Sequence, residues 1–75
     1  MNKKFIHKNK EFEIRQAEID DEYCVRVYYD NNQVSPTYSV SKEIEGIYHT
    51  QTGKSMVDEL KETAQSDIER DFYIS

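Results

Sequence analysis

Three side chains of this sequence, Cys24, His7 and His49, have the chemistry of metal ligands or of a nucleophile and its base. Zinc sites use close ligand pairs, such as two cysteines about two to four residues apart, whereas these residues are isolated from one another. A cysteine nucleophile needs a neighbouring base, and the sequence places none at a defined position. We therefore expect no metal, no cofactor and no catalytic residue, and we interpret the chain as non-enzymatic.

Residues 52–55 have the sequence Thr-Gly-Lys-Ser, and Gly-Lys-Ser is also the sequence that ends a phosphate-binding loop. Such a loop opens with a glycine that four residues separate from its Gly-Lys-Ser end, so that backbone N–H groups can curl around a phosphate. That first position is Tyr48 here, and Gly46 stands too early in the chain. We predict that Gly53 forms a turn and that Ser55 caps a helix.

Carboxylates are numerous, with 15 acidic against 10 basic residues and a net charge of -5. Acid–base catalysis needs burial that moves the pKa values of two carboxyl groups apart, whereas turns and outer helix faces keep them solvated. We interpret these acids as solvated surface. They are Glu18, Asp20, Asp21 and Glu22 near one turn, and Asp58, Glu59, Glu62, Asp67, Glu69 and Asp71 towards the C-terminus.

Residues 3–40 alternate between apolar and polar side chains, which predicts antiparallel strands with one covered and one open face. We expect strands at about 4–7, 11–19, 22–30 and 33–40, joined by turns that Asx residues favour. The turns set the register. A turn at 8–9 pairs Phe5 with Phe12, and a turn at 20–21 pairs Phe12 with Tyr29 and Ile14 with Val27. A turn at 31–32 pairs Tyr29 with Val34, Val25 with Tyr38, and Tyr23 with Val40.

After residue 41 the apolar side chains recur at helical spacing instead of alternating. Ser41 is expected to cap a short helix at about 42–49, and Ser55 with Asp58 to begin a longer helix at about 54–71. The longer helix carries an apolar stripe made of Val57, Leu60, Ala64, Ile68 and Phe72. This stripe should cover the apolar sheet face. The expected fold is a single α+β domain over residues 1–75, a three- to four-stranded antiparallel meander with the C-terminal helix packed on one sheet face.

The same register places Arg15 opposite Arg26 on the open sheet face. Like charges opposed across two strands destabilise a sheet, so another group should offset the repulsion. Glu13 and Asp30 could do so locally. Alternatively, the open face binds a partner, and the candidate binding residues are Arg15, Arg26, Tyr28 and Thr37, because Arg and Tyr are favoured at interfaces. A protein-interaction or regulatory module is our leading hypothesis, with an unknown protein partner and a possible homodimer.

Basic residues are concentrated at the start of the chain, where residues 1–10 contain no acid. The four lysines, Lys3, Lys4, Lys8 and Lys10, suggest an alternative function in weak, salt-sensitive nucleic-acid binding. The acidic helix would repel the same phosphates. Nucleic acid is therefore an unlikely partner.

Residues 52–64 resemble the opening of the helix in HicB-type antitoxin domains, which pair a three-stranded sheet with one helix. The Pro-Gly-Cys segment that precedes the helix in that family is absent here. The resemblance implies a HicB-like antitoxin-type regulator as a further alternative. The order of three strands and a helix also resembles double-stranded RNA-binding domains. Neither likeness carries a functional residue over to this sequence.

Composition indicates a folded domain of modest stability. Apolar residues make up 36% of the chain, and six tyrosines add large rings that can be buried while their hydroxyls stay hydrated. A single cysteine, no apolar run long enough to span a membrane and no secretory signal indicate a cytoplasmic protein with no membrane partner. The Lys, Asn, Ile and Tyr usage suits an AT-rich bacterial or phage genome.

Overall fold

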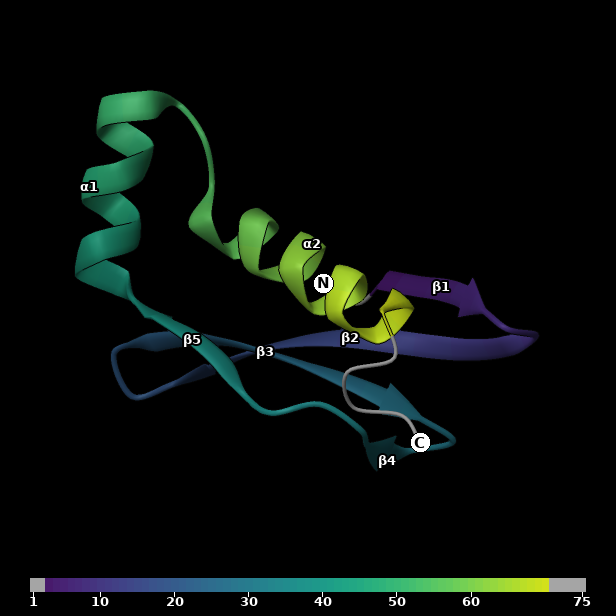
Figure 1. Ribbon diagram of the computed structural model, residues 1–75. Coiled ribbons are helices and arrows are strands. Elements are labelled where there is room, and N and C mark those ends of the chain that lie inside the picture. Colours follow the sequence, from purple (N-terminus) through teal and green to yellow (C-terminus); the bar gives the residue numbers. More distant parts are fainter. Residues whose placement is uncertain (1–2, 71–75) are drawn as a thin grey trace.

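The computed structural model describes residues 3–70, and its α+β fold has a five-stranded antiparallel sheet covered on one face by a helix (Figure 1). The elements in chain order are β1 (Lys3–His7), β2 (Lys10–Ile19), β3 (Glu22–Tyr29), β4 (Asn32–Gln33), β5 (Tyr38–Ser41), α1 (Lys42–Thr52) and α2 (Met56–Glu69). Strands β1, β2 and β3 are consecutive neighbours, and both β4 and β5 pair with β3. The predicted fold class is confirmed.

The first two hairpins have the predicted register. Phe5 pairs with Phe12 across β1 and β2, and Phe12 pairs with Tyr29 across β2 and β3. Their rings are in contact, with centroids 5.4 Å apart for the first pair and 5.3 Å for the second. A slip of one residue would turn all three rings to the other face, so their contact stabilises this register.

The third hairpin turns one residue earlier than predicted. Asp30 and Asn31 form the turn with φ values of 51° and 63°, because the tightest hairpin turns need positive φ at both central residues. Tyr29 therefore pairs with Asn32, and the predicted pairing of Tyr29 with Val34 is wrong.

The predicted strand at 33–40 is also wrong as a continuous strand, because residues 34–37 break it into β4 and β5. Pro36 lies in this break and has no N–H to donate to a ladder. Beyond the break, Val25 pairs with Tyr38 as predicted. The break shifts the register by two residues, an even number, so the apolar residues of β5 still lie on the covered face.

Helix α1 begins at the predicted cap, where the Ser41 hydroxyl accepts a hydrogen bond from the Ile44 N–H at 3.1 Å. It extends to Thr52, beyond the predicted end at residue 49. The reason is that Gly53, with a φ of 72°, supplies the left-handed residue that commonly ends a helix.

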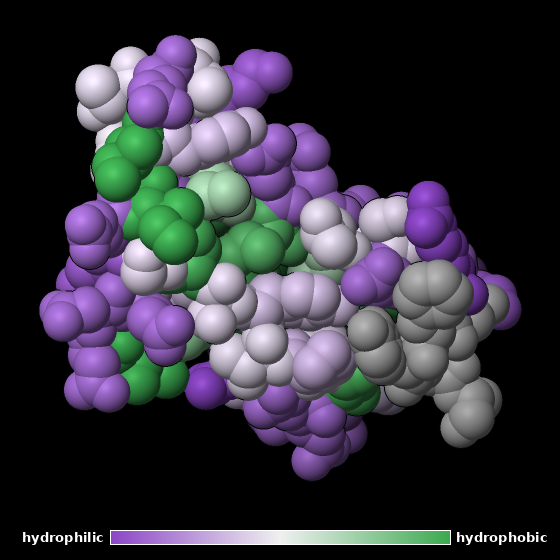
Figure 2. Space-filling model, turned by 60° about the vertical axis from the view of Figure 1, so that its left-hand side comes forward, coloured by the Kyte–Doolittle hydropathy of each residue, from purple (hydrophilic) through white to green (hydrophobic). Residues whose placement is uncertain are grey.

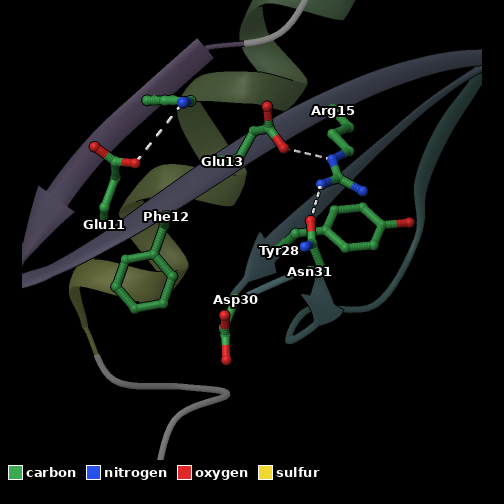
Figure 3. A pocket seen from close by; sticks show the side chains of 8 residues that line it. Glu11, Phe12, Glu13, Arg15, Tyr28, Asp30 and Asn31 are labelled. Atoms are coloured by element: carbon green, nitrogen blue, oxygen red, sulfur yellow. Dashed lines mark hydrogen bonds and ion pairs between the residues drawn. The ribbon is translucent and has the colours of Figure 1, made fainter.

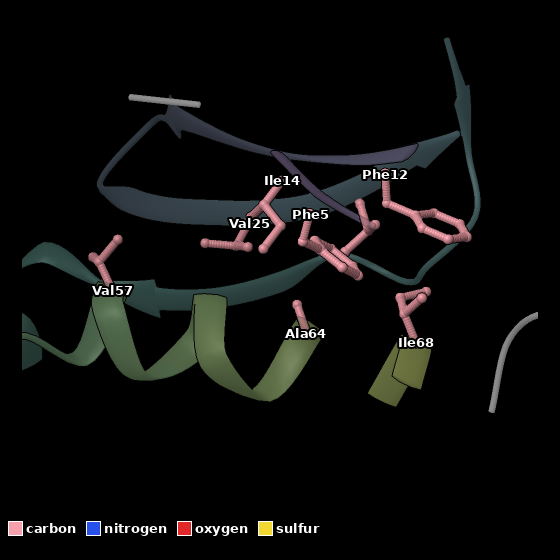
Figure 4. Packing of buried hydrophobic residues seen from close by; sticks show 8 residues of the cluster. Phe5, Phe12, Ile14, Val25, Val57, Ala64 and Ile68 are labelled. Atoms are coloured by element: carbon pink, nitrogen blue, oxygen red, sulfur yellow. The ribbon is translucent and has the colours of Figure 1, made fainter. Parts of the chain in front are cut away.

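Helix α2 begins after Ser55, whose hydroxyl accepts from the Asp58 N–H at 3.3 Å. This cap makes Met56 the first helical residue, and the helix ends at Glu69, so it is shorter than the predicted 54–71. The predicted stripe residue Phe72 and the acid Asp71 lie outside the described residues. The core between α2 and the sheet consists of Phe5, Phe12, Ile14, Val25, Val27, Val57, Ala64 and Ile68, with Leu60 partly buried beside it (Figure 4).

Ser35 replaces a backbone partner that the break in the sheet removes. The buried Val27 N–H donates to the Ser35 hydroxyl at 2.9 Å. Replacing Ser35 with Ala leaves that N–H without an acceptor, so we expect a loss of about 1–3 kcal/mol in the free energy of unfolding, measured by urea denaturation. The control is Ser39→Ala on β5, where the side chain is exposed. An equal loss in both variants would contradict this role of Ser35.

Ile68 anchors the covering helix and is fully buried, at 0% exposure. Ile68→Val removes one methylene group from the core and is expected to lower the free energy of unfolding by about 0.5–1.5 kcal/mol. The matched control is Ile6→Val, because Ile6 is 72% exposed on β1. Denaturation curves that coincide for Ile68→Val and the parent protein would show that α2 does not pack as described.

Candidate functional site

The sheet face opposite α2 carries the two arginines that the sequence placed there. Arg15 pairs with Arg26 across β2 and β3, as predicted. Their neighbours Ile14 and Val27 point into the core, so alternation directs both guanidinium groups away from α2. Both arginines are half-buried. Two like charges opposed across neighbouring strands repel each other, so surrounding groups must offset the repulsion.

Arg15 is held by three neighbours (Figure 3). Its Nε donates to Glu13 Oε1 at 2.5 Å, and its Nη2 donates to Asn31 Oδ1 at 2.9 Å. The Tyr28 ring lies against the guanidinium, with the Arg15 Cζ 4.1 Å from the ring centroid. Glu13 thus offsets the charge of Arg15 as expected. The second hydrogen-bond acceptor of Arg15 is the neutral Asn31, where we had expected the carboxylate of Asp30.

A shallow hollow of about 350 Å³ surrounds the Arg15 cluster. Its lining is mainly polar, and the residues are Lys4, Glu11, Phe12, Glu13, Arg15, Tyr28, Asp30 and Asn31. The Lys4 ammonium lies 3.8 Å from the Glu11 carboxylate, and both side chains are more than half exposed. Charges of both signs therefore meet in the hollow, and several of them already have a partner of opposite charge.

Arg26 has a different environment. Its Nε donates to the Thr37 hydroxyl at 2.9 Å, and within residues 3–70 no carboxylate lies within ion-pair distance of its guanidinium. Thr37 reaches this position because the break between β4 and β5 carries it alongside β3. The four predicted residues thus form two adjacent pairs, Arg15 with Tyr28 and Arg26 with Thr37, of which only the first has a compensating acid.

Asn31 is the residue of this site that sequence reasoning missed. It stood out only as a turn residue, since Asx side chains tolerate positive φ. The signal that could have found it is the turn itself, because a two-residue loop at 30–31 leaves the Asn31 side chain within reach of the Arg15 guanidinium.

The N-terminal lysines do not form one basic stripe. Lys3 and Lys4 are consecutive in β1 and therefore lie on opposite faces of the sheet. The Lys10 ammonium is 5.6 Å from the centroid of the Tyr29 ring, and Lys8 lies in the first hairpin turn with a φ of 53°.

Cys24 pairs with Ala17 on β2 and with Ser39 on β5. Its side chain is only 4% exposed. Among residues 3–70, no three histidine, cysteine or acidic side chains are grouped closely enough to hold a metal ion.

Lys42 joins the start of α1 to the sheet. Its ammonium donates to Glu18 Oε2 at 3.0 Å and lies 5.5 Å from the centroid of the Tyr23 ring. The hydrogen bond to Glu18 is the main reason why the pKa of Lys42 is raised above its ordinary value. This contact joins the first residue of α1 to the C-terminal end of β2.

Comparison with known proteins supplies no assignment: no protein-family model, curated protein or solved structure matches this chain. Of the two helices within residues 3–70, neither combines the length and apolar character needed to cross a membrane. The functional argument therefore depends on the side chains of the open face.

Glu13 should stabilise the fold mainly by offsetting the repulsion between Arg15 and Arg26. Glu13→Gln is expected to lower the free energy of unfolding by about 1 kcal/mol at low salt, and by less in an Arg26→Gln background, where that repulsion is gone. Urea denaturation of the double-mutant cycle measures the difference. The control is Glu11→Gln, which removes only an exposed contact. Equal losses in the two backgrounds would contradict the coupling.

Proposed function

We propose that this chain is a non-enzymatic protein-interaction or regulatory module that binds an acidic segment of a partner protein on its open sheet face. The observation that carries the proposal is Arg26, a half-buried guanidinium that has a hydroxyl partner but no carboxylate partner. A guanidinium presents parallel N–H donors that match a carboxylate, and such pairs are among the stronger hydrogen bonds in proteins. A partner carboxylate would offset the charge that the chain leaves uncompensated.

The surroundings of Arg26 support an interface. Arg15 is fixed by Glu13, Asn31 and the Tyr28 ring, so it loses little side-chain freedom when a partner binds. Rigid arginines and tyrosines are the residue types that contribute most to binding energy at protein interfaces. Glu11, Glu13 and Asp30 line the hollow around Arg15 and would repel any anion there, so we expect the partner carboxylate beside Arg26, which does not line that hollow. A cytoplasmic setting fits the single unpaired Cys24.

The test is charge reversal at the uncompensated arginine. A fluorescein-labelled peptide of alternating Glu and Ala is the probe, and fluorescence anisotropy measures its affinity. Arg26→Glu is expected to weaken binding by at least about tenfold, because an attractive contact becomes a repulsive one. Circular dichroism checks that the fold is retained.

The matched control is Arg70→Glu, which changes net charge equally at the exposed C-terminal end of α2. A Lys/Ala peptide and a single-stranded RNA serve as competitors. If Arg26→Glu and Arg70→Glu weaken binding equally, the effect is one of net charge and the proposed site is wrong. Tighter binding of the RNA than of the acidic peptide would favour the nucleic-acid alternative.

A further inference from the structure

The two outer edges of the sheet differ in charge. Among residues 3–70, β1 pairs only with β2, and β5 pairs only with β3, so each strand has one side without a neighbouring strand (Figure 1). Proteins commonly place charged side chains on such an edge, which discourages pairing with another chain. Strand β1 has Lys3 and Lys4, whereas β5, with the sequence Tyr-Ser-Val-Ser, has no charged residue. Strand β5 is therefore the less protected edge.

The backbone groups of Ser39 point towards this free edge. In an antiparallel pair, residues that bond to the neighbouring strand alternate with residues whose N–H and C=O point away from it. The Lys42 N–H donates to the Asp21 carbonyl at 2.8 Å, and β5 pairs with β3 in the same register. This register assigns the bonds with β3 to Val40 and Tyr38. Ser39, which lies between them, therefore presents both of its backbone groups outwards.

The charge of Arg26 reaches the same edge. Arg26 lies on β3, yet its Nε donates to the Thr37 hydroxyl at 2.9 Å, and Thr37 directly precedes β5. The guanidinium thus extends across one strand spacing of about 4.8 Å. Facing side chains of adjacent strands are about 5 Å apart, so a carboxylate on a strand beyond β5 lies within reach of it.

The covered side of β5 is apolar and incompletely buried. Tyr38 and Val40 pack against the core, but both are only partly buried. Figure 2 shows hydrophobic side chains that continue from α1 towards the body of the molecule. The side chains of an added strand would alternate between the two faces. Those on the open face would meet Arg26, and those on the covered face would meet Tyr38 and Val40.

We propose that the partner segment binds as an added antiparallel strand along β5, with acidic residues on the open face and apolar residues on the covered face. Main-chain hydrogen bonds provide affinity in such strand addition, and alternate side chains provide specificity. The antiparallel direction is favoured because antiparallel pairing is slightly more stable per residue than parallel pairing. This inference rests on the proposed function, the binding of an acidic segment at Arg26.

A second copy of this chain is a poorer occupant of the edge. Strand β5 has no acidic residue, so two copies joined at β5 would bring two Arg26 guanidinium groups to one interface without a carboxylate for either. Like charges on neighbouring strands repel each other. Because β5 has only four residues, few backbone bonds can form, and a partner that also pairs with Arg26 should bind better.

The test places methyl groups on the backbone of a peptide and measures its affinity for the full chain by fluorescence anisotropy. The probe is a fluorescein-labelled peptide of alternating Glu and Val. In the antiparallel arrangement, the residue paired with Ser39 lies on the same face as Ser39 and directs its N–H to β5. N-methylation of the Glu residues should therefore weaken binding by at least about tenfold. The matched control is N-methylation of the Val residues, which should change affinity by less than about twofold because those groups point away from β5.

Two variants at Ser39 test the same edge from the protein side. Ser39→Pro removes the outward N–H, and proline is tolerated in an edge strand where that N–H faces solvent. This variant should weaken peptide binding by at least about tenfold, whereas Ser39→Ala keeps the N–H and should leave affinity unchanged. Circular dichroism checks that both variants fold. The methylated peptides use the parent protein, so their result stands even if Ser39→Pro does not fold.

The outcomes separate this inference from the proposed function. If Arg26→Glu weakens binding but the two methylated peptides bind equally, strand addition is wrong and the proposed function stands. Loss of binding only on methylation of the Val residues overturns the antiparallel arrangement. If the parent protein does not bind the peptide, or if Arg26→Glu leaves its affinity unchanged, the proposed function is wrong and this inference fails with it.

Discussion

Burial of one sheet face beneath α2 is the constraint on which the rest of this structure depends. Ala64 and Ile68 are fully buried against the sheet, together with Ile14 and Val27 of its central strands. Because successive side chains of a strand point to opposite faces, this burial also specifies which residues lie on the open face. The covered face therefore determines which residues form the candidate binding surface.

The opposition of Arg15 and Arg26 is a direct result of that constraint. Moving either strand by one residue would separate the arginines, but it would also expose the core residues of that strand. Glu13, Asn31 and Tyr28 hold Arg15, whereas the Thr37 hydroxyl holds Arg26 without a compensating charge. This unequal compensation of charge is the reason why we propose Arg26, and not Arg15, as the residue that binds a partner carboxylate.

The two helices differ in how much of their surface the small core can bury. Domains below about 70–80 residues seldom gain much stability from one core, and α2 occupies the face where that core forms. Helix α1 has well-formed caps at Ser41 and Gly53 but no buried side chain. Its local sequence makes it helical, whereas its position at the end of the sheet keeps its isoleucines exposed.

The features that sequence reasoning predicted correctly are periodic or local. Alternation and the turns near residues 8–9 and 20–21 were sufficient for the register of β1, β2 and β3, and the hydroxyls of Ser41 and Ser55 marked the helix starts. Both signals act between residues that are adjacent in the chain or joined by a tight turn, so no knowledge of distant neighbours was needed.

Features that involve residues far apart in the chain emerged only in three dimensions. The break at residues 34–37 depends on Ser35 replacing a backbone partner of β3, and the fixing of Arg15 depends on Asn31, 16 residues away. The exposure of Ile44 and Ile47 depends on the direction in which α1 leaves the sheet. Composition and spacing do not encode such contacts, because each arises from the relative placement of whole elements.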